Sequence, residues 1–292
     1  MAYTWVLLAL ISAFTLATSD ALTKKALARS NEYLVAWFRL LFSIPLLLLL
    51  WIFIPVPELD FDFYKAFTLA LPLEIIAIVL YIKALKISPL SLTLPFLSLT
   101  PVFLILVSYL ILEEKVSFQG GIGIILIAVG SYILNLHEMK KGIFKPLKAI
   151  TKEKGSVLMI CVALIFSVTS SLGKMAIVHS SPLFFGITYF VLVTIIFAPI
   201  ALWMGRSELK SFISGKQFKG LLFPGIFYSI MIASHMIAIS LTKVAYMISI
   251  KRTSLLIGVI YGYFLFKEKS IKERLSGAAL MFTGFVMIVT AS

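Results

Sequence analysis

The feature that most constrains this chain is a succession of apolar segments, each about 20 residues long, along nearly all of its 292 residues. A helix of about 20 apolar residues crosses the roughly 30 Å hydrocarbon core of a bilayer. Hydrophobic residues make up 61% of the chain and charged residues 13%, against about 25% charged residues in soluble domains. The sequence therefore predicts an all-α integral membrane protein, multi-pass in the cell membrane, with no room for a soluble catalytic domain.

Charges, prolines and glycines divide these segments into ten predicted transmembrane helices. We expect them at residues 3–27, 33–54, 64–86, 89–112, 117–136, 156–178, 182–204, 218–241, 244–266 and 271–290. The first lacks a basic start and is too long for a signal-peptide core, so we expect it to be retained. Pro89, Pro95 and Pro101 predict a bent fourth helix, because a membrane tolerates freed backbone carbonyls only where protein or water satisfies them.

The two halves of the chain repeat each other. A shift of 154 residues places 112–132 over 266–286 and matches Glu114 with Glu268, Lys115 with Lys269, Gly123 with Gly277 and Gly130 with Gly284. A weaker match, at a shift of 150, pairs Lys24 with Lys174. We interpret 1–137 as a first five-helix repeat, 138–154 as a basic linker and 155–292 as a second five-helix repeat. Because five is odd, equivalent helices would cross the membrane in opposite directions, which is typical of transporters.

The net charge of +13 is spread over short loops and the linker. It therefore indicates topology and attraction to anionic lipid headgroups, and no nucleic-acid partner is expected. The crowding of Lys and Arg on one side predicts a cytoplasmic linker and external termini by the positive-inside rule. The single cysteine, Cys161, excludes an internal disulfide and a Cys-based metal site. We expect no metal and no cofactor.

Ten helices in two inverted halves, with Glu114-Lys115 and then Glu268-Lys269 before each glycine-bearing last helix, resemble the EamA branch of the drug/metabolite transporter superfamily. The resemblance covers nearly the whole chain. It implies a carrier of small metabolites such as amino acids, without ATP-binding domains, working through a central cavity between the halves. It also implies cytoplasmic termini, opposite to the orientation that the lysine count predicts.

Lys251 and Arg252 stand together well inside the ninth predicted helix. On insertion scales two such cations cost about 5–7 kcal/mol, whereas each Leu, Ile, Phe or Val returns only about 0.3–0.6 kcal/mol. Either they face a central aqueous site, or they snorkel to headgroups or pair internally. A distant resemblance to sugar-phosphate translocators implies the first reading, because those relatives carry an adjacent Lys-Arg in the corresponding helix, where it binds the substrate phosphate.

Other polar residues within the spans are further candidates, each with a structural alternative. Glu74 could carry a proton, or it could pair with Arg39, Lys251 or Arg252. Arg39 could bind substrate or snorkel from the second helix. His235 could titrate or bind substrate, or be a hydrogen-bonded structural histidine. Tyr228 could contact a ligand or pack in the bundle.

Hydroxyl residues form a stripe on the first helix at Ser12, Thr15, Ser19 and Thr23, and on the sixth at Ser167, Ser170 and Ser171, where Lys174 continues it. These stripes either line a cavity or bind helices together. The spacing of Asp20 and Lys24 predicts a local ion pair. The four repeated glycines predict close helix contacts.

We therefore predict a secondary transporter of a small polar, anionic metabolite such as an amino acid, organic acid or phosphorylated metabolite. Its expected substrate-binding residues are Lys251, Arg252, Arg39, His235, Lys174 and Tyr228, and its coupling residue is Glu74. The alternative is a lipid-carrier flippase that recognises a lipid phosphate. The sequence shows no catalytic motif of an intramembrane enzyme. The expected partners are the substrate and membrane lipids, and the sequence leaves room for a homodimer.

Overall fold

A computed structural model describes residues 3–27, 30–88, 94–136, 154–266 and 271–292, and within them the chain is helical and contains no strand. The first half comprises α1 (Thr4–Leu27), α2 (Glu32–Trp51), α3 (Phe61–Ile87), the 3-10 helix η1 (Leu94–Leu99), α5 (Thr100–Leu112) and α6 (Phe118–Leu136). The second half comprises α8 (Lys154–Val178), α9 (Pro182–Met204), α10 (Leu209–Ser214), α11 (Lys216–Gly220), α12 (Leu222–Leu241), α13 (Val244–Lys251), α14 (Ser254–Phe266) and α15 (Ile271–Ala291).

Seven helical segments of the described chain are long and apolar enough to span a membrane. They are Thr4–Lys24, Glu32–Trp51, Phe61–Ile87, Lys154–Val178, Pro182–Met204, Lys216–Leu241 and Val244–Gly262. Three further apolar helices are shorter: Phe96–Leu112, Phe118–Leu134 and Leu275–Ala291. The all-α membrane fold is therefore confirmed, whereas the count of ten spans stays a prediction.

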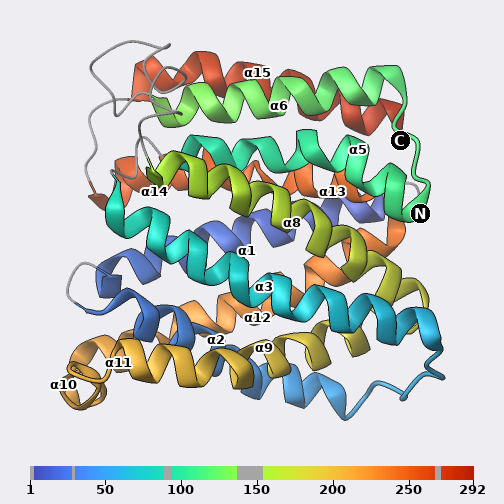
Figure 1. The fold of residues 1–292 in the computed structure, drawn as a ribbon. Coiled ribbons are helices and arrows are strands. Elements are labelled where there is room, and N and C mark those ends of the chain that lie inside the picture. Colours follow the sequence, from blue (N-terminus) through green and yellow to red (C-terminus); the bar gives the residue numbers. More distant parts are fainter. Residues whose placement is uncertain (1–2, 28–29, 89–93, 137–153, 267–270) are drawn as a thin grey trace.

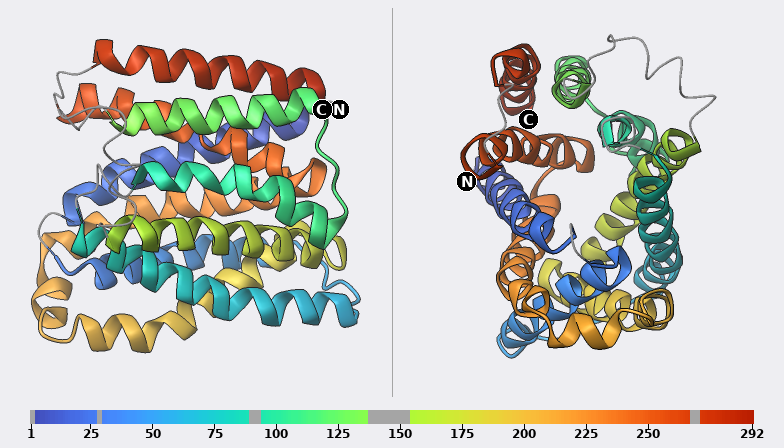
Figure 2. Two further views of the ribbon diagram at one scale, coloured as in Figure 1. Left: turned by 45° about the horizontal axis from the view of Figure 1, so that its top comes forward. Right: turned by 90° about the vertical axis from the view of Figure 1, so that its left-hand side faces the viewer.

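The long helices run roughly alongside one another, and both chain termini lie at the same end of the bundle (Figure 1). We call this the terminus end. At the opposite end α1 gives way to α2, and the chain leaves α6 and re-enters at α8, so we call it the linker end. Viewed along the helices, the bundle surrounds a central region, with α6 and α15 side by side at its edge (Figure 2).

The pairing of α6 with α15 shows how the two halves are related. A methyl group at Gly123 would lie 2.8 Å from the Gly284 carbonyl oxygen, and one at Gly130 would lie 2.6 Å from the Gly277 carbonyl oxygen. The first glycine of α6 therefore meets the second of α15, and the second meets the first. This crossed pairing requires antiparallel helices, so the two equivalent helices run in opposite directions. The predicted close contact at all four glycines is confirmed.

Two predicted helices are interrupted. The described part of the fourth is η1 followed by α5, and Pro101 lies in the first turn of α5, where its missing N–H costs no helical hydrogen bond. The predicted bend itself stays a prediction, and Pro89 lies outside the described residues. The ninth was expected to be continuous over 244–266, and this is wrong. It breaks after Lys251, where Thr253 Oγ1 and Thr253 N both donate to the Ile250 carbonyl, at 2.8 and 2.9 Å.

The remaining differences concern the connections. The segment between the seventh and eighth predicted helices contains the short helix α10, which the sequence did not predict, and α11 overlaps the predicted start of the eighth helix at residue 218. Phe212 of α10 stacks on Phe38 of α2 with ring centroids 5.2 Å apart, so this segment packs against the bundle. The predicted linker at 138–154 lies outside the described residues except for Lys154.

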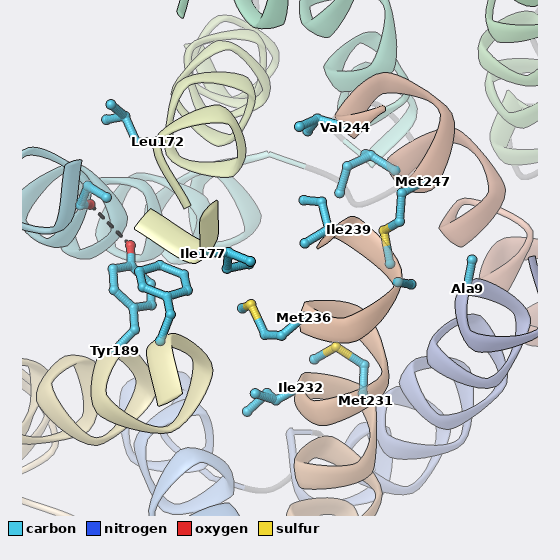
Figure 3. Close-up of a cluster of buried hydrophobic side chains, with 14 of the residues drawn as sticks. Ala9, Leu172, Ile177, Tyr189, Met231, Ile232, Met236, Ile239, Val244 and Met247 are labelled. Atoms are coloured by element: carbon cyan, nitrogen blue, oxygen red, sulfur yellow. Dashed lines mark hydrogen bonds between the residues drawn. The ribbon is translucent and has the colours of Figure 1, made fainter. Parts of the chain in front are cut away.

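Buried apolar side chains hold the centre of the bundle together. Figure 3 shows Ile232 and Met236 of α12 on one side of this cluster and Tyr189 of α9 on the other. The Tyr189 hydroxyl donates to the Ala70 carbonyl of α3 at 3.1 Å, which satisfies the polar end of a 5% exposed side chain. The same central residues form walls of the cavity described next.

Candidate binding cavity

A cavity of about 700 Å³ lies between the two halves. The first half contributes α1, α2, α3, η1 and the start of α5, and the second contributes α8, α9, α12, α13 and the start of α14. Six of the residues predicted as site residues from the sequence line this cavity: Arg39, Glu74, Tyr228, His235, Lys251 and Arg252. Intramembrane polar residues that are far apart in the sequence are thus brought to one place.

The cavity is accessible at the linker end and covered at the terminus end. Among its lining residues near the linker end, Leu27 is 45% exposed and the Lys86 side chain 61% exposed. Near the terminus end, Ile177 is 4% and Ile239 2% exposed. The structure is therefore open toward the linker end, with an apolar floor at the terminus end.

Lys251 and Arg252 occupy the break between α13 and α14. Lys251 Nζ lies 3.4 Å from His235 Nδ1 on α12, and Arg252 Nη2 donates to Thr100 Oγ1 on α5 at 3.0 Å. In the described part of the chain no carboxylate lies within 4.0 Å of either cation. The side-chain nitrogens of the pair thus contact neutral partners, and the positive charge is left uncompensated by any described ion pair.

Arg39 is held inside the bundle by two partners. Its Nη1 donates to Asp20 Oδ1 of α1 at 2.6 Å, and its guanidinium carbon lies 4.6 Å from the centroid of the Tyr228 ring on α12. Arg39 therefore does not snorkel to headgroups, because its partners hold it at the cavity wall. Asp20 was expected to pair with Lys24 one turn away, and this stays a prediction, while Asp20 Oδ1 accepts a hydrogen bond from Arg39 of the neighbouring helix.

Glu74 of α3 lines the cavity and faces the hydroxyls of Thr169 on α8 and Tyr189 on α9. Among the described residues it forms no ion pair within 4.0 Å, so the predicted structural pair with Arg39, Lys251 or Arg252 is not found. The cavity thus holds an unpaired carboxylate in addition to the unpaired cations of the ninth span. Neither Thr169 nor Tyr189 was singled out from the sequence, because a lone hydroxyl in an apolar helix carries no distinguishing pattern.

Lys174 lies apart from the cavity lining. Its Nζ is 2.6 Å from Glu114 Oε1, and it also donates to the Thr242 carbonyl. The hydroxyl stripe that it continues is mainly used in packing, since Ser167 and Ser171 donate to carbonyls of their own helix and Ser170 alone of those three lines the cavity. On α1 likewise, Ser19 donates to the Pro224 carbonyl of α12 and Thr23 lines the cavity.

The family model for "EamA-like transporter family" matches residues 3–136 and again residues 153–290. The chain belongs to the EamA-like transporter family. The EamA family is part of the drug/metabolite transporter superfamily, so this chain is a membrane transporter of that superfamily and an integral protein of the cell membrane. Family members are transporters and not enzymes.

This EamA-like transporter is similar in fold to a solved structure. A solved structure titled "Crystal structure of protein" matches with a TM-score of 0.76 and 13% sequence identity, over 97% of this chain and 95% of the other. At that identity the likeness concerns the fold. A search of the curated proteins finds no match. Substrate assignment for this EamA-like transporter therefore depends on the cavity itself.

Proposed function

We propose that this EamA-like transporter is a secondary transporter that moves a small polar, anionic metabolite by alternating access between its two repeats. The candidate substrates are amino acids, organic acids and phosphorylated metabolites. The observation that supports this most is the position of Lys251 and Arg252. They line the cavity between the repeats at a helix break, with no carboxylate within 4.0 Å among the described residues.

The energetics of burial favour an anionic ligand for this pair. A Lys or Arg at the centre of a membrane helix costs about 2.5–3.5 kcal/mol on insertion scales. Asp20 pairs with Arg39 and Glu114 with Lys174, and Glu74, which also lines the cavity, forms no described ion pair with either cation. A substrate carboxylate or phosphate would supply the missing opposite charge.

The helix break between α13 and α14 also favours a substrate-binding role for Lys251. Because α13 ends at Lys251, the negative end of its dipole favours the lysine charge there. Interrupted helices with charged groups at the interruption are a recurrent way of building substrate sites in transporters with inverted repeats.

The neighbouring residues would complete the site. Arg39 has guanidinium donors beyond the one bonded to Asp20, and its position against the Tyr228 ring fixes its direction. His235 lies beside Lys251 and can accept or donate a hydrogen bond. We assign these three residues to substrate contacts, secondary to Lys251 and Arg252.

Glu74 is the residue we assign to coupling. A carboxylate without an ion pair in a membrane cavity can bind and release a proton as the cavity changes its access, and intramembrane acids are frequent proton carriers. In this proposal, transport of the anion is linked to protonation of Glu74. The pair Lys251–Arg252 holds the anion. Proton binding and release by Glu74 connect the movement of the anion to the proton gradient.

A binding screen tests the site without requiring transport. Purified protein is heated with glutamate, succinate, 3-phosphoglycerate or a short-chain phosphatidic acid, and the melting temperature is compared with that of the free protein. A ligand that binds the folded state raises this temperature. We expect an anionic solute to do so in the wild type and in Lys83→Ala, which removes an exposed lysine outside the cavity, but not in Lys251→Ala or Arg252→Ala. Stabilisation by the lipid alone would favour a flippase, and equal shifts in all four proteins would remove the pair from the site.

A further inference from the structure

Glu114, in the turn between α5 and α6, bonds to two separate parts of the second half. Its Oε1 lies 2.6 Å from Lys174 Nζ on α8, and its Oε2 accepts a hydrogen bond from the Val244 backbone N–H at 2.8 Å. Lys174 donates in addition to the Thr242 carbonyl. The Glu114 and Lys174 side chains are only 11% and 13% exposed. One carboxylate of the first repeat thus ties together α8 and the link between α12 and α13.

The backbone conformation and contacts of the α5–α6 turn position the Glu114 side chain. The preceding residue, Glu113, closes α5 in the left-handed region with φ 57° and ψ 21°. Further along the turn, Ser117 N and Ser117 Oγ lie 3.2 and 3.0 Å from the hydroxyl of Tyr246, which is fully buried on α13. The turn therefore contacts the first helical turn of α13 at two points, Val244 and Tyr246.

These contacts adjoin, along the chain, three buried isoleucines of the cavity wall. Lys174 comes three residues before Ile177, Thr242 three residues after Ile239, and Val244 four residues before Ile248. The three isoleucines line the cavity and are 2–7% exposed. Val244 and Ile248, four residues apart on α13, lie on the same face of that helix. Opening the floor requires α8 to separate from the end of α12 and the start of α13, and these are the elements that Glu114 and Lys174 hold together.

We propose that Glu114, Lys174, the Thr242 carbonyl and the Val244 N–H form a terminus-side lock, which keeps the cavity shut at the terminus end while it is open at the linker end. Release of Lys174 by Glu114 is the step that permits opening at the terminus end. Lys174, predicted as a substrate residue, acts in the lock instead. The inference rests on the proposed alternating access.

The lock is also connected mechanically to the proposed substrate pair. Helix α13 has eight residues, about 12 Å at 1.5 Å per residue. Val244 at its start belongs to the lock, and Lys251 at its end lines the cavity. A rigid helix of this length transmits a displacement from one end to the other, so an anion at Lys251 and the state of the lock are expected to influence each other.

Distances between α8 and α12 at the terminus end test the lock without any substrate. Spin labels are placed at Val178→Cys and Leu241→Cys, two exposed positions that end these helices, in a Cys161→Ser background in nanodiscs. The interspin distance distribution is recorded for the unmodified lock, for Glu114→Gln and for Lys174→Met. Glu113→Gln is the matched control, because it removes the adjacent exposed carboxylate.

We expect one short distance in the labelled protein and in Glu113→Gln. Glu114→Gln and Lys174→Met should add a longer distance, with the equilibrium shifted by about 5- to 150-fold, the range of ordinary coupling between sites. If Glu114→Gln fails to fold, Lys174→Met breaks the same ion pair and leaves the bond to Val244 in place. Unchanged distributions in the folded variants would overturn the lock and leave the transport proposal standing. Absence of transport in vesicles would sink the transport proposal without altering the distance result.

Discussion

Gly123 of α6 faces Gly284 of α15 so closely that a methyl group on Gly123 would lie 2.8 Å from the Gly284 carbonyl oxygen and 2.8 Å from the Ile288 side chain. Because one of these two obstacles is backbone, the helices themselves would have to move apart. Gly123→Ala should therefore lower the free energy of unfolding by about 1–3 kcal/mol, the usual cost of overpacking.

Gly258 of α14 provides the matched control for this substitution. A methyl group there meets no atom within 4 Å, so Gly258→Ala should leave stability unchanged or raise it by up to about 1 kcal/mol through helix propensity. Reversible unfolding of both variants in detergent measures the difference. Equal stability of the two variants would contradict the close α6–α15 packing.

Glu113 holds a backbone conformation that suits glycine better than glutamate. Its φ of 57° lies in the left-handed region at the end of α5, and side chains with a Cβ disfavour that region by about 1–2 kcal/mol. Glu113→Gly should raise the melting temperature, with a gain of roughly 0.5–1 kcal/mol after the greater flexibility of unfolded glycine is subtracted. Glu113→Ala keeps the Cβ and should bring no such gain. A lower melting temperature for the glycine variant would show that the Glu113 side chain is needed.

Much of the site could be predicted from the sequence because charges are scarce in the spans. A charged or titratable side chain within an apolar helix avoids lipid and turns toward the bundle interior. That rule alone gathers Arg39, Glu74, His235, Lys251 and Arg252 on one cavity. The repeated glycines likewise predicted the α6–α15 contact, since their spacing suits one helix face.

The partners of these residues could not be predicted in the same way. Glu114 and Lys174 are 60 positions apart, and no spacing rule joins them. The break after Lys251 depends on local hydroxyl and backbone bonds of Thr253, which a hydropathy pattern does not distinguish from a continuous helix. The contact between Asp20 and Arg39 of the neighbouring helix likewise follows from no spacing rule, because the two residues are 19 positions apart.

Asp60, outside the spans at the start of α3, gives a pH dependence of stability. The Phe63 backbone N–H, and next the hydrogen bond to His179, hold the pKa of the Asp60 carboxyl below its ordinary value. Since the pKa is lowered by folding, this contribution is present above the unfolded pKa of about 3.9 and is lost as the pH falls through the folded value. Asp60→Ala should melt below the wild type at neutral pH, and the two melting temperatures should converge as the pH falls through the lowered pKa of Asp60.

The control for Asp60→Ala is an acidic residue of the same loop for which the structure describes no such hydrogen bonds. Glu58 is exposed in the same connection, and Glu58→Ala should melt like the wild type throughout. A constant gap between Asp60→Ala and wild type down to the acid end would mean that the carboxylate charge is not the source of the stability.

Glu74→Gln should separate substrate binding from proton coupling. The amide keeps the size and hydrogen-bonding capacity of the side chain but cannot titrate. In vesicles, the variant should still exchange labelled for unlabelled substrate, while an imposed pH gradient no longer drives accumulation. Glu58→Gln, outside the cavity, should respond to the gradient like the wild type. A full response in Glu74→Gln would exclude Glu74 as the coupling residue.

The central claim is that Lys251 and Arg252 hold the transported anion, and its most direct test is uptake into reconstituted vesicles. Uptake of radiolabelled glutamate, succinate and 3-phosphoglycerate is measured for the wild type, Lys251→Ala, Arg252→Ala and the control Lys83→Ala. A hydrogen bond to a charged group contributes about 1.5–3 kcal/mol, so uptake of the accepted anion should fall by roughly 10- to 150-fold in both cavity variants and be unchanged in Lys83→Ala. Wild-type rates in both Lys251→Ala and Arg252→Ala would contradict the account.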